Sequence, residues 1–64
     1  MSKSGGYKVE CFVDNCWHHR IWRKSEIAAV AIAEVESQSR KLTYRVIFEQ
    51  KIICLVNKDG KREI

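Results

Sequence analysis

The hydrophobic and polar residues alternate over the first part of the chain, and this pattern predicts an antiparallel hairpin. Every second residue from Tyr7 to Val13 is apolar or a cysteine, and residues 17–23 alternate in a similar way. A period of two places one set of side chains on the core side of a strand. Asp14 and Asn15 favour a turn between the two runs, because both residue types tolerate a left-handed backbone.

The segment after this hairpin has the features of a helix. Ser25 is a suitable N-cap, and Glu26 would lie in the first turn, where the helix dipole favours an acid. The following residues, through Ser39, include four alanines. The helical periodicity predicts a buried face on this segment, formed by Ile27, Ala28, Ala31, Ile32 and Val35.

Two more apolar runs predict a second hairpin and, with it, the fold class. Residues 42–49 alternate strictly, and residues 51–57 follow with their own alternation after a tight connection near Gln50–Lys51. The Asp59–Gly60 pair predicts a further turn before a short last edge strand. The expected order is β-β-α-β-β. This is an α+β fold: a small antiparallel sheet of four or five strands with one helix packed on one face.

The size and composition of the chain indicate one small domain. The 64 residues contain 45% hydrophobic residues and no proline, so we expect a packed domain over residues 7–64 after a flexible leader over residues 1–6. The three cysteines are an odd number, which favours free thiols in a cytoplasmic protein. Neither a signal peptide nor a membrane segment is expected from the sequence.

The cysteines and histidines of residues 11–19 raise the questions of metal binding and of catalysis. A zinc site would need ligands from neighbouring strands to converge, and the candidate ligands are Cys11, Cys16, His18 and Cys54. Their spacing lacks the paired ligands of known zinc motifs, so small core thiols are the favoured interpretation and no cofactor is expected. Cys16 and His18 share one side of a strand, but a nucleophilic site also needs a pocket. The sequence therefore predicts a protein that is not an enzyme.

The distribution of charge predicts a basic surface on the strands and turns. Twelve Lys and Arg against eight Asp and Glu give a net charge of +4, and the predicted helix carries three Glu. In a regular strand over residues 17–23, Trp17 and Ile21 would pack under the helix, whereas His18, Arg20 and Trp22 would face outward with Lys24. The other residues expected on the outward side are Lys8, Glu10, Phe12, Thr43, Arg45, Ile47, Glu49, Ile53 and Leu55.

The C-terminal half resembles small phage-encoded inhibitors of bacterial defence, in particular type I-F anti-CRISPR proteins. The resemblance lies in the helix opened by "SEIAA", the apolar hairpin after it, and the closing "KDGKR". It implies a short, basic, non-catalytic protein in the cytosol of the host cell, which docks on the nucleic-acid channel of a defence complex. It also implies contact residues in the closing motif: Lys58, Lys61 and Arg62.

Taken together, these patterns predict an interaction module that binds a host protein or ribonucleoprotein complex and occludes it. Phe12 and Trp22 would anchor the partner, while Arg20, Lys24, Arg45 and Lys61 would steer it. The same basic and aromatic residues also suit a nucleic-acid-binding accessory protein. The apolar outward residues are also compatible with a homodimer.

Overall fold

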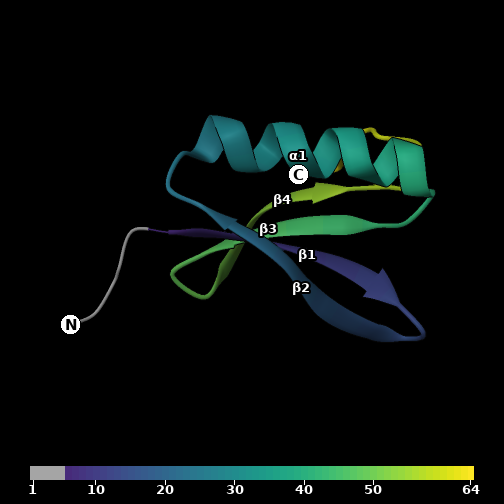
Figure 1. Ribbon diagram of the computed structural model, residues 1–64, viewed down its shortest axis with the longest axis horizontal. Helices are drawn as coiled ribbons and strands as arrows, with labels where there is room; N and C mark the ends of the chain where they lie inside the picture. The colour runs from purple at the N-terminus through teal and green to yellow at the C-terminus, as the bar shows by residue number, and fades with distance from the viewer. Residues whose placement is uncertain (1–5) are drawn as a thin grey trace.

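The computed structural model describes residues 6–64, which form one helix and four strands in the order that the sequence predicts (Figure 1). The elements are β1 (Tyr7–Val13), β2 (Cys16–Arg23), α1 (Glu26–Arg40), β3 (Tyr44–Phe48) and β4 (Lys51–Val56). The strands form one antiparallel sheet with the order β2-β1-β3-β4. Because α1 packs on one face of this sheet, the α+β fold predicted from the sequence is confirmed.

Two tight turns close the hairpins. Asp14 and Asn15 have φ angles of 54° and 64°, so the predicted turn has the left-handed backbone that these residue types tolerate. The β3–β4 turn lies one residue earlier than predicted, at Glu49 and Gln50, whose φ angles are 52° and 68°. Neither of these two residue types favours that region, which explains why the sequence did not locate the turn.

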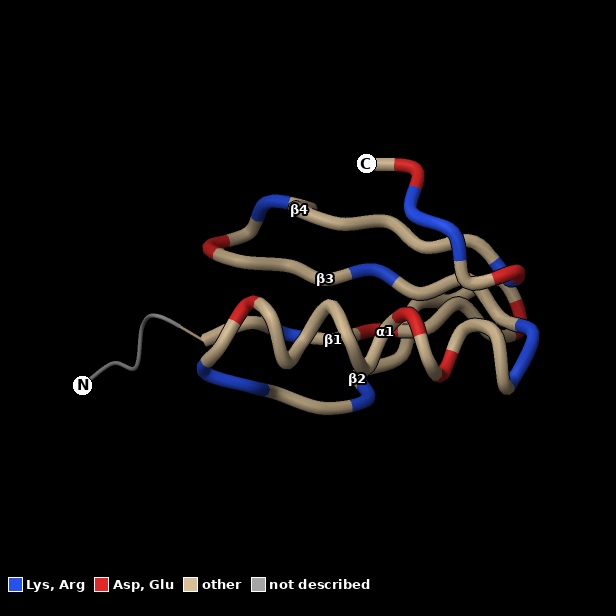
Figure 2. The backbone as a smooth tube through the Cα atoms, turned by 90° about the horizontal axis from the view of Figure 1, so that it is seen from above, with Lys and Arg blue, Asp and Glu red and all other residues tan. Residues whose placement is uncertain are grey.

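The last predicted strand is reduced to a single bridge between Val56 and Arg62. Gly60 has a φ of 81°, and the Asn57 side chain accepts hydrogen bonds from the backbone N–H groups of Asp59 and Lys61 at 2.9 and 3.1 Å. This turn brings the C-terminal residues against the outer edge of β4 (Figures 1 and 2). The described sheet therefore has four strands.

The core lies between α1 and the sheet. It consists of eight buried residues: Val9, Cys11, Ala29, Ala33, Tyr44, Val46, Cys54 and Val56. On the sheet these residues follow the alternation expected for β1, β3 and the end of β4.

The predicted buried face of the helix is wrong for three of its five residues: Ala28 and Ile32 are half-buried, and Ile32 packs against the core, but the other three are exposed. Ile27 and Val35 are 82% and 66% exposed, and Ala31 is exposed between them. The residues that α1 buries completely are Ala29, Ala33 and Ser37, which lie four residues apart. Small side chains at these positions let α1 pack closely against the buried side chains of β1 and β3. Ser25 caps the helix as predicted, with its Oγ accepting from the Ala28 N–H at 3.3 Å.

Both edge strands contain a β-bulge. In β2, Ile21 pairs with Val9 and His19 pairs with Glu10, which leaves Arg20 as the extra residue. In β4, Cys54 pairs with Val46 and Ile52 pairs with Ile47, which leaves Ile53 unpaired. A bulge shifts the alternation of a strand by one residue, so every side chain beyond it changes face. These two shifts decide which residues lie on the side of the sheet opposite α1.

Within residues 6–64, α1 is too short and too polar to cross a lipid bilayer.

Candidate functional site

The candidate site is the side of the sheet opposite α1, which we call the open face. No element of the described chain crosses it. Cross-strand partners share a face, so the register places the members of this surface in rows. The apolar members of the open face are Phe12, Trp17, Trp22, Ile47, Ile52 and Leu55, and its polar members are Lys8, Glu10, His19 and Arg45.

Trp17 lies on the open face, whereas a regular strand would have placed it under the helix. The bulge at Arg20 reverses the alternation between Trp17 and Trp22, and Trp17 is therefore paired with Phe12. The ring centroids of Phe12 and Trp17 are 5.0 Å apart with a tilt of 55°. The prediction for Trp17 is thus wrong, and both tryptophans occupy the same side of the sheet.

Arg45 is held in place by Trp17 and Glu10. Its guanidinium carbon lies 4.1 Å from the centre of the Trp17 ring, which is a cation–π geometry. Its Nη2 also lies 2.7 Å from Oε1 of Glu10 on the neighbouring strand. Arg45 is on the outward side as predicted, but its charge is compensated by Glu10. It therefore fixes the ring of Trp17 more than it adds positive potential to the surface.

Trp22 forms the other end of the aromatic surface. It pairs with Lys8 and is 44% exposed, while Phe12 is 38% exposed. Its indole lies directly against Gly6, so that a Cβ built on Gly6 would overlap Nε1 of Trp22. Of the leader expected over residues 1–6, Gly6 is thus part of the packed domain, and residues 1–5 lie outside the described part of the chain.

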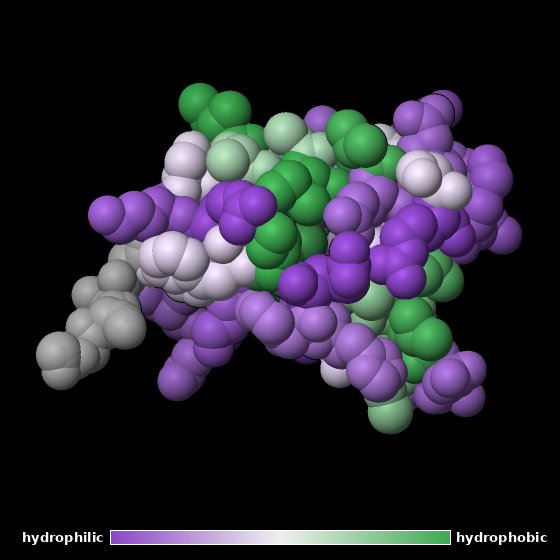
Figure 3. All heavy atoms as spheres, viewed as in Figure 1, coloured by the Kyte–Doolittle hydropathy of each residue, from purple (hydrophilic) through white to green (hydrophobic). Residues whose placement is uncertain are grey.

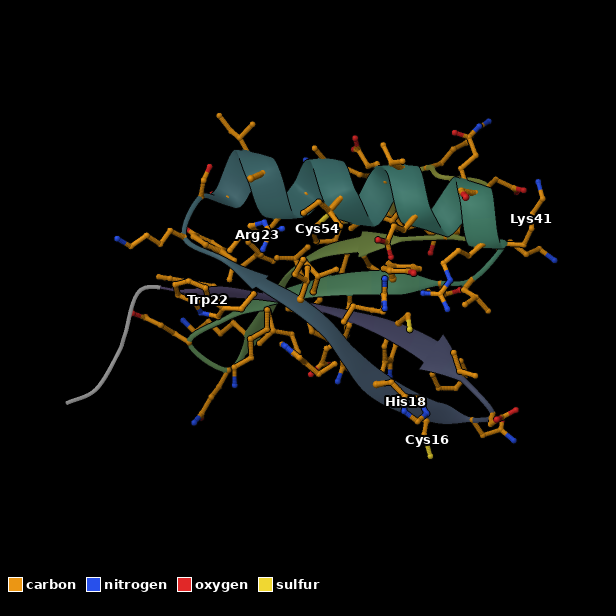
Figure 4. The ribbon with its side chains drawn as sticks, in the orientation of Figure 1. Cys16, His18, Trp22, Arg23, Lys41 and Cys54 are labelled. Atoms are coloured by element: carbon orange, nitrogen blue, oxygen red, sulfur yellow. The ribbon has the colours of Figure 1, made fainter. Side chains whose placement is uncertain are left out.

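Figure 4 shows Trp22 and Arg23 on opposite sides of β2. The outward placement predicted for Phe12 and Trp22 agrees with the register.

Arg20 does not lie beside Trp22 on the open face, as the sequence predicted. As the extra residue of the bulge it points toward α1, where its Nε donates to Oε1 of Glu36 at 3.1 Å and its Nη2 to Oε2 at 3.3 Å. The Tyr44 hydroxyl donates to the same Oε1 at 2.8 Å, and Arg40 in turn donates to that hydroxyl at 3.0 Å. Arg20 therefore ties the edge strand to the helix.

The contacts of Glu36 with Arg20 and Tyr44 make the stability of the folded chain depend on pH. The hydrogen bond from Arg20 is the main reason that the pKa of Glu36 lies below its usual value. A lowered pKa means that folding favours the carboxylate, so its contribution is complete above the unfolded pKa of about 4.3 and is lost as the pH falls through the folded pKa. We expect Glu36→Gln to destabilise the chain at pH 7 and to cost progressively less below about pH 4.

Urea unfolding of the wild type and of Glu36→Gln between pH 7 and pH 2.5 checks this prediction. A difference in unfolding free energy that stays constant over the whole range would contradict it. Glu63→Gln is a suitable control, because Glu63 is an exposed carboxylate that bonds only to Asn57 among the described side chains.

The remaining basic candidates lie away from the open face. His18 pairs with the buried Cys11, so it is on the helix side of β2 rather than on the predicted outer side, and it is exposed near the hairpin tip. Lys24 is exposed in the connection between β2 and α1. The three residues of the closing motif lie near the outer edge of β4: Lys58, Lys61 and Arg62. Figure 2 shows these cations spread over the turns and edges around α1.

The apolar outward residues are also partly reassigned. Ile47 and Leu55 lie on the open face as predicted, but Ile53 is the bulged residue of β4 and packs against the core. Ile52 takes its place on the open face. The sequence does not indicate whether Ile52 or Ile53 faces the core, because an alternating pattern can begin at either of these two adjacent residues.

The four candidate zinc ligands do not converge. Cys16 and His18 lie together near the tip of the β1–β2 hairpin, whereas Cys54 lies under α1 (Figure 4). Within residues 6–64 no group of three or more His, Cys, Asp or Glu is arranged to hold a metal ion. Burial raises the pKa of the Cys54 thiol, which disfavours the thiolate that a metal would need. Cys11 and Cys54 are buried free thiols in the core.

A scan against protein-family models found no match to this chain, and neither did searches of curated proteins and of solved structures.

Proposed function

We propose that this chain is a non-enzymatic interaction module that binds another protein through the open face. The observation that carries the proposal is that Phe12, Trp17 and Trp22 all lie on one sheet face that no described element covers. Tryptophan is among the residue types that contribute most to interface energies, and an aromatic patch of this kind marks a docking surface.

The charge of the open face favours a protein over a nucleic acid as its partner. Its two cations are Lys8 and Arg45, and the second is paired with Glu10 at 2.7 Å. One face of the Trp17 ring is covered by Arg45, so a base has limited access to it. A surface that holds a nucleic acid needs several uncompensated cations along the phosphates.

Nucleic-acid binding is the second candidate, and one observation favours it. Trp22 is exposed beside Lys8, and a stacked base with its phosphate would fit such a pair. The two functions differ in their response to salt, because the affinity for a single strand falls by a slope of about −0.7 per phosphate contact in a log–log plot. A gel shift of a 30-nucleotide single strand at 50 and 200 mM salt separates them.

The narrower part of the proposal concerns the class of partner. The resemblance to type I-F anti-CRISPR proteins suggests a phage-encoded inhibitor that occludes a host defence complex. In this proposal the aromatic residues of the open face anchor the chain, while Lys58, Lys61 and Arg62 contribute charge from the edge of β4. Arg20 has no role in it, because its side chain is bound to Glu36.

The test compares three immobilised chains in a nuclease-treated bacterial lysate: wild type, Phe12→Ser with Trp22→Ser, and Ile64→Ser as control. Both open-face residues are more than a third exposed, so their replacement should preserve the fold. Ile64 is an exposed apolar residue in neither the open face nor α1. We expect a protein that the wild type and the control retain and the double variant loses.

Direct binding of the purified partner should then be about 1000-fold weaker for the double variant, since two lost anchors at about 2 kcal/mol each cost about 4 kcal/mol. If all three immobilised chains retained the same proteins from the lysate, the proposal would be overturned. For the narrower part, a purified type I-F complex should lose its binding to a labelled target duplex when the wild-type chain is added. Unchanged duplex binding would remove the defence complex from the proposal and leave the docking surface intact.

A further inference from the structure

Within residues 6–64, one edge of the sheet is left unpaired. The edge strands are β2 and β4, from the order β2-β1-β3-β4. The outer side of β4 is occupied by the C-terminal residues, because the Glu63 N–H donates to the Leu55 carbonyl at 2.7 Å. The Asn57 N–H likewise donates to the Lys61 carbonyl at 2.9 Å. No described segment bonds in this way to the outer side of β2, the longest of the described strands with eight residues.

The register shows which backbone groups of β2 point outward. The Phe12 N–H donates to the Thr43 carbonyl at 2.9 Å, so the backbone groups of Phe12 are directed toward β3. In an antiparallel pair, opposite residues alternate between those that exchange hydrogen bonds and those that do not. Trp17, which is paired with Phe12, therefore directs its own N–H and C=O away from β1, and His19 does the same. These are the groups with which an added strand would pair.

The other end of β2, beyond the bulge, is positively charged. The Trp22 carbonyl accepts a hydrogen bond from Nη1 of Arg23 at 2.9 Å, so this end offers an added strand charge more than backbone pairing. Three cations are exposed here, Lys8, Arg23 and Lys24, and none of them makes an ion pair with another described residue. Residues 15–25 contain no acid. Figure 2 shows two blue stretches along β2 at the edge of the sheet.

We propose that the edge of β2 receives an acidic, extended segment of the partner protein, which adds a fifth strand to the sheet. The backbone of this segment pairs with Trp17 and His19, and its acidic side chains lie near Arg23 and Lys24. Alternate side chains of the added strand lie on the same side as Trp17 and Trp22, so the strand widens the open face. The inference rests on the proposed function, because it describes how the same partner is held.

The features that protect this edge from other strands favour an acidic one. Cations and bulges on an edge strand are means by which proteins prevent edge-to-edge association. A second copy would bring β2, which lacks acidic residues, against an identical strand. An acidic segment is attracted by the same cations, so that the edge discriminates between classes of strand. Figure 3 shows mostly hydrophilic residues across the lower front of the molecule, where β2 lies in Figure 1.

A peptide titration followed by NMR tests the proposal. The probe is an eight-residue peptide that alternates valine and glutamate. One control peptide has lysine in place of glutamate, and the other has proline in place of its two central valines. The glutamate peptide should slow the amide exchange of Trp17 and His19 about 5-fold at about four times its dissociation constant. Neither control peptide should protect these two amides, because one is repelled and the other cannot complete the backbone pairing.

Two outcomes of the titration contradict the proposal. Equal protection by the lysine peptide or by the proline peptide would overturn the acidic strand. The absence of protection by the glutamate peptide at about 5 mM, which exceeds the dissociation constant of even a weak complex, would also overturn it. A wild type that is dimeric at 1 mM, with Trp17 and His19 protected in the absence of peptide, would show that a second copy covers the edge.

Charge reversal distinguishes the β2 edge from a general attraction to a basic protein. Arg23→Glu with Lys24→Glu, the β2 charge variant, should bind the glutamate peptide about 10-fold more weakly, because two attractions between exposed charges become repulsions. Lys41→Glu with Lys51→Glu is the matched control, since it makes the same change in net charge at exposed residues outside β2. Equal losses in the two variants would overturn the proposal.

The lysate experiment separates this inference from the proposed function. If the β2 charge variant retains the partner as the wild type does, while the open-face double variant loses it, the inference fails and the proposed function stands. If the open-face double variant retains the same proteins as the wild type, the proposed function fails. Protection of Trp17 and His19 by the glutamate peptide then still supports the edge of β2 as a site for an acidic strand.

Discussion

Replacing Tyr44 with alanine is expected to leave the chain without a folded state at 25 °C. Tyr44 is fully buried in the middle of the core, and its hydroxyl donates to Glu36 at 2.8 Å. Truncation of a buried aromatic residue costs about 3–5 kcal/mol. A single core in a domain of this size supplies about the same amount. The loss therefore equals the whole stability of the domain.

Circular dichroism and urea titration of Tyr44→Ala measure this effect, and Tyr44→Phe separates the ring from the hydroxyl. The phenylalanine keeps the packing and loses the hydrogen bond to a charged group, so we expect a cost of about 1.5 kcal/mol and a cooperative transition. A cooperative transition of Tyr44→Ala at nearly the wild-type midpoint would show that the core does not depend on this ring.

The opposite effect is expected at the β3–β4 turn: Glu49→Asn with Gln50→Gly should stabilise the chain by about 2 kcal/mol. Both residues have a positive φ, which costs an ordinary side chain roughly 1–2 kcal/mol and costs glycine almost nothing. The Asn-Gly pair is the sequence that two-residue hairpin turns of this kind favour. The midpoint of urea unfolding should rise by roughly 1–2 M.

The β1–β2 turn provides the matched control, because it has the same backbone and better residues. Asp14 and Asn15 have φ angles of 54° and 64°. Asp14→Asn with Asn15→Gly should therefore gain less than about 1 kcal/mol. Equal gains at the two turns would mean that residue type does not decide the strain at Glu49 and Gln50.

The order of the elements was predictable because each element has a strong local signal. Strict alternation marks β1 and β3, and Ser25 with the alanines after it marks α1. These signals arise within a few residues and need no knowledge of the neighbouring strands. The turn at Glu49 and Gln50 was missed by one residue because its conformation is imposed by the pairing of β3 with β4.

The faces of the edge strands were less predictable, because each contains a bulge. Trp17 and Trp22 are five positions apart, so a regular strand directs them to opposite sides. Only the pairing with β1 shows that Arg20 is an extra residue and that both rings share the open face. The sequence offers one signal, the run of three polar residues before Ile21, which interrupts the alternation of apolar residues.

The buried side of α1 was mispredicted for a different reason. Ranking residues by hydrophobicity selects Ile27 and Val35, whereas the residues that α1 buries against the sheet include the small alanines at 29 and 33. Volume, and not hydrophobicity, decides which side of this helix faces the sheet. As a result, the bulky Ile27 and Val35 remain exposed on the outer side of α1.

The contact between Trp22 and Gly6 has a practical consequence for any fusion protein made from this chain. A tag joined at the N-terminus is connected to the domain at Gly6, directly beside the Trp22 end of the open face. A tag at the C-terminus is joined near Arg62, which pairs with Val56 at the outer edge of β4 and lines a hollow beside α1. If the open face binds the partner, the N-terminal fusion should therefore weaken binding more than the C-terminal fusion, without changing a single residue of the folded domain.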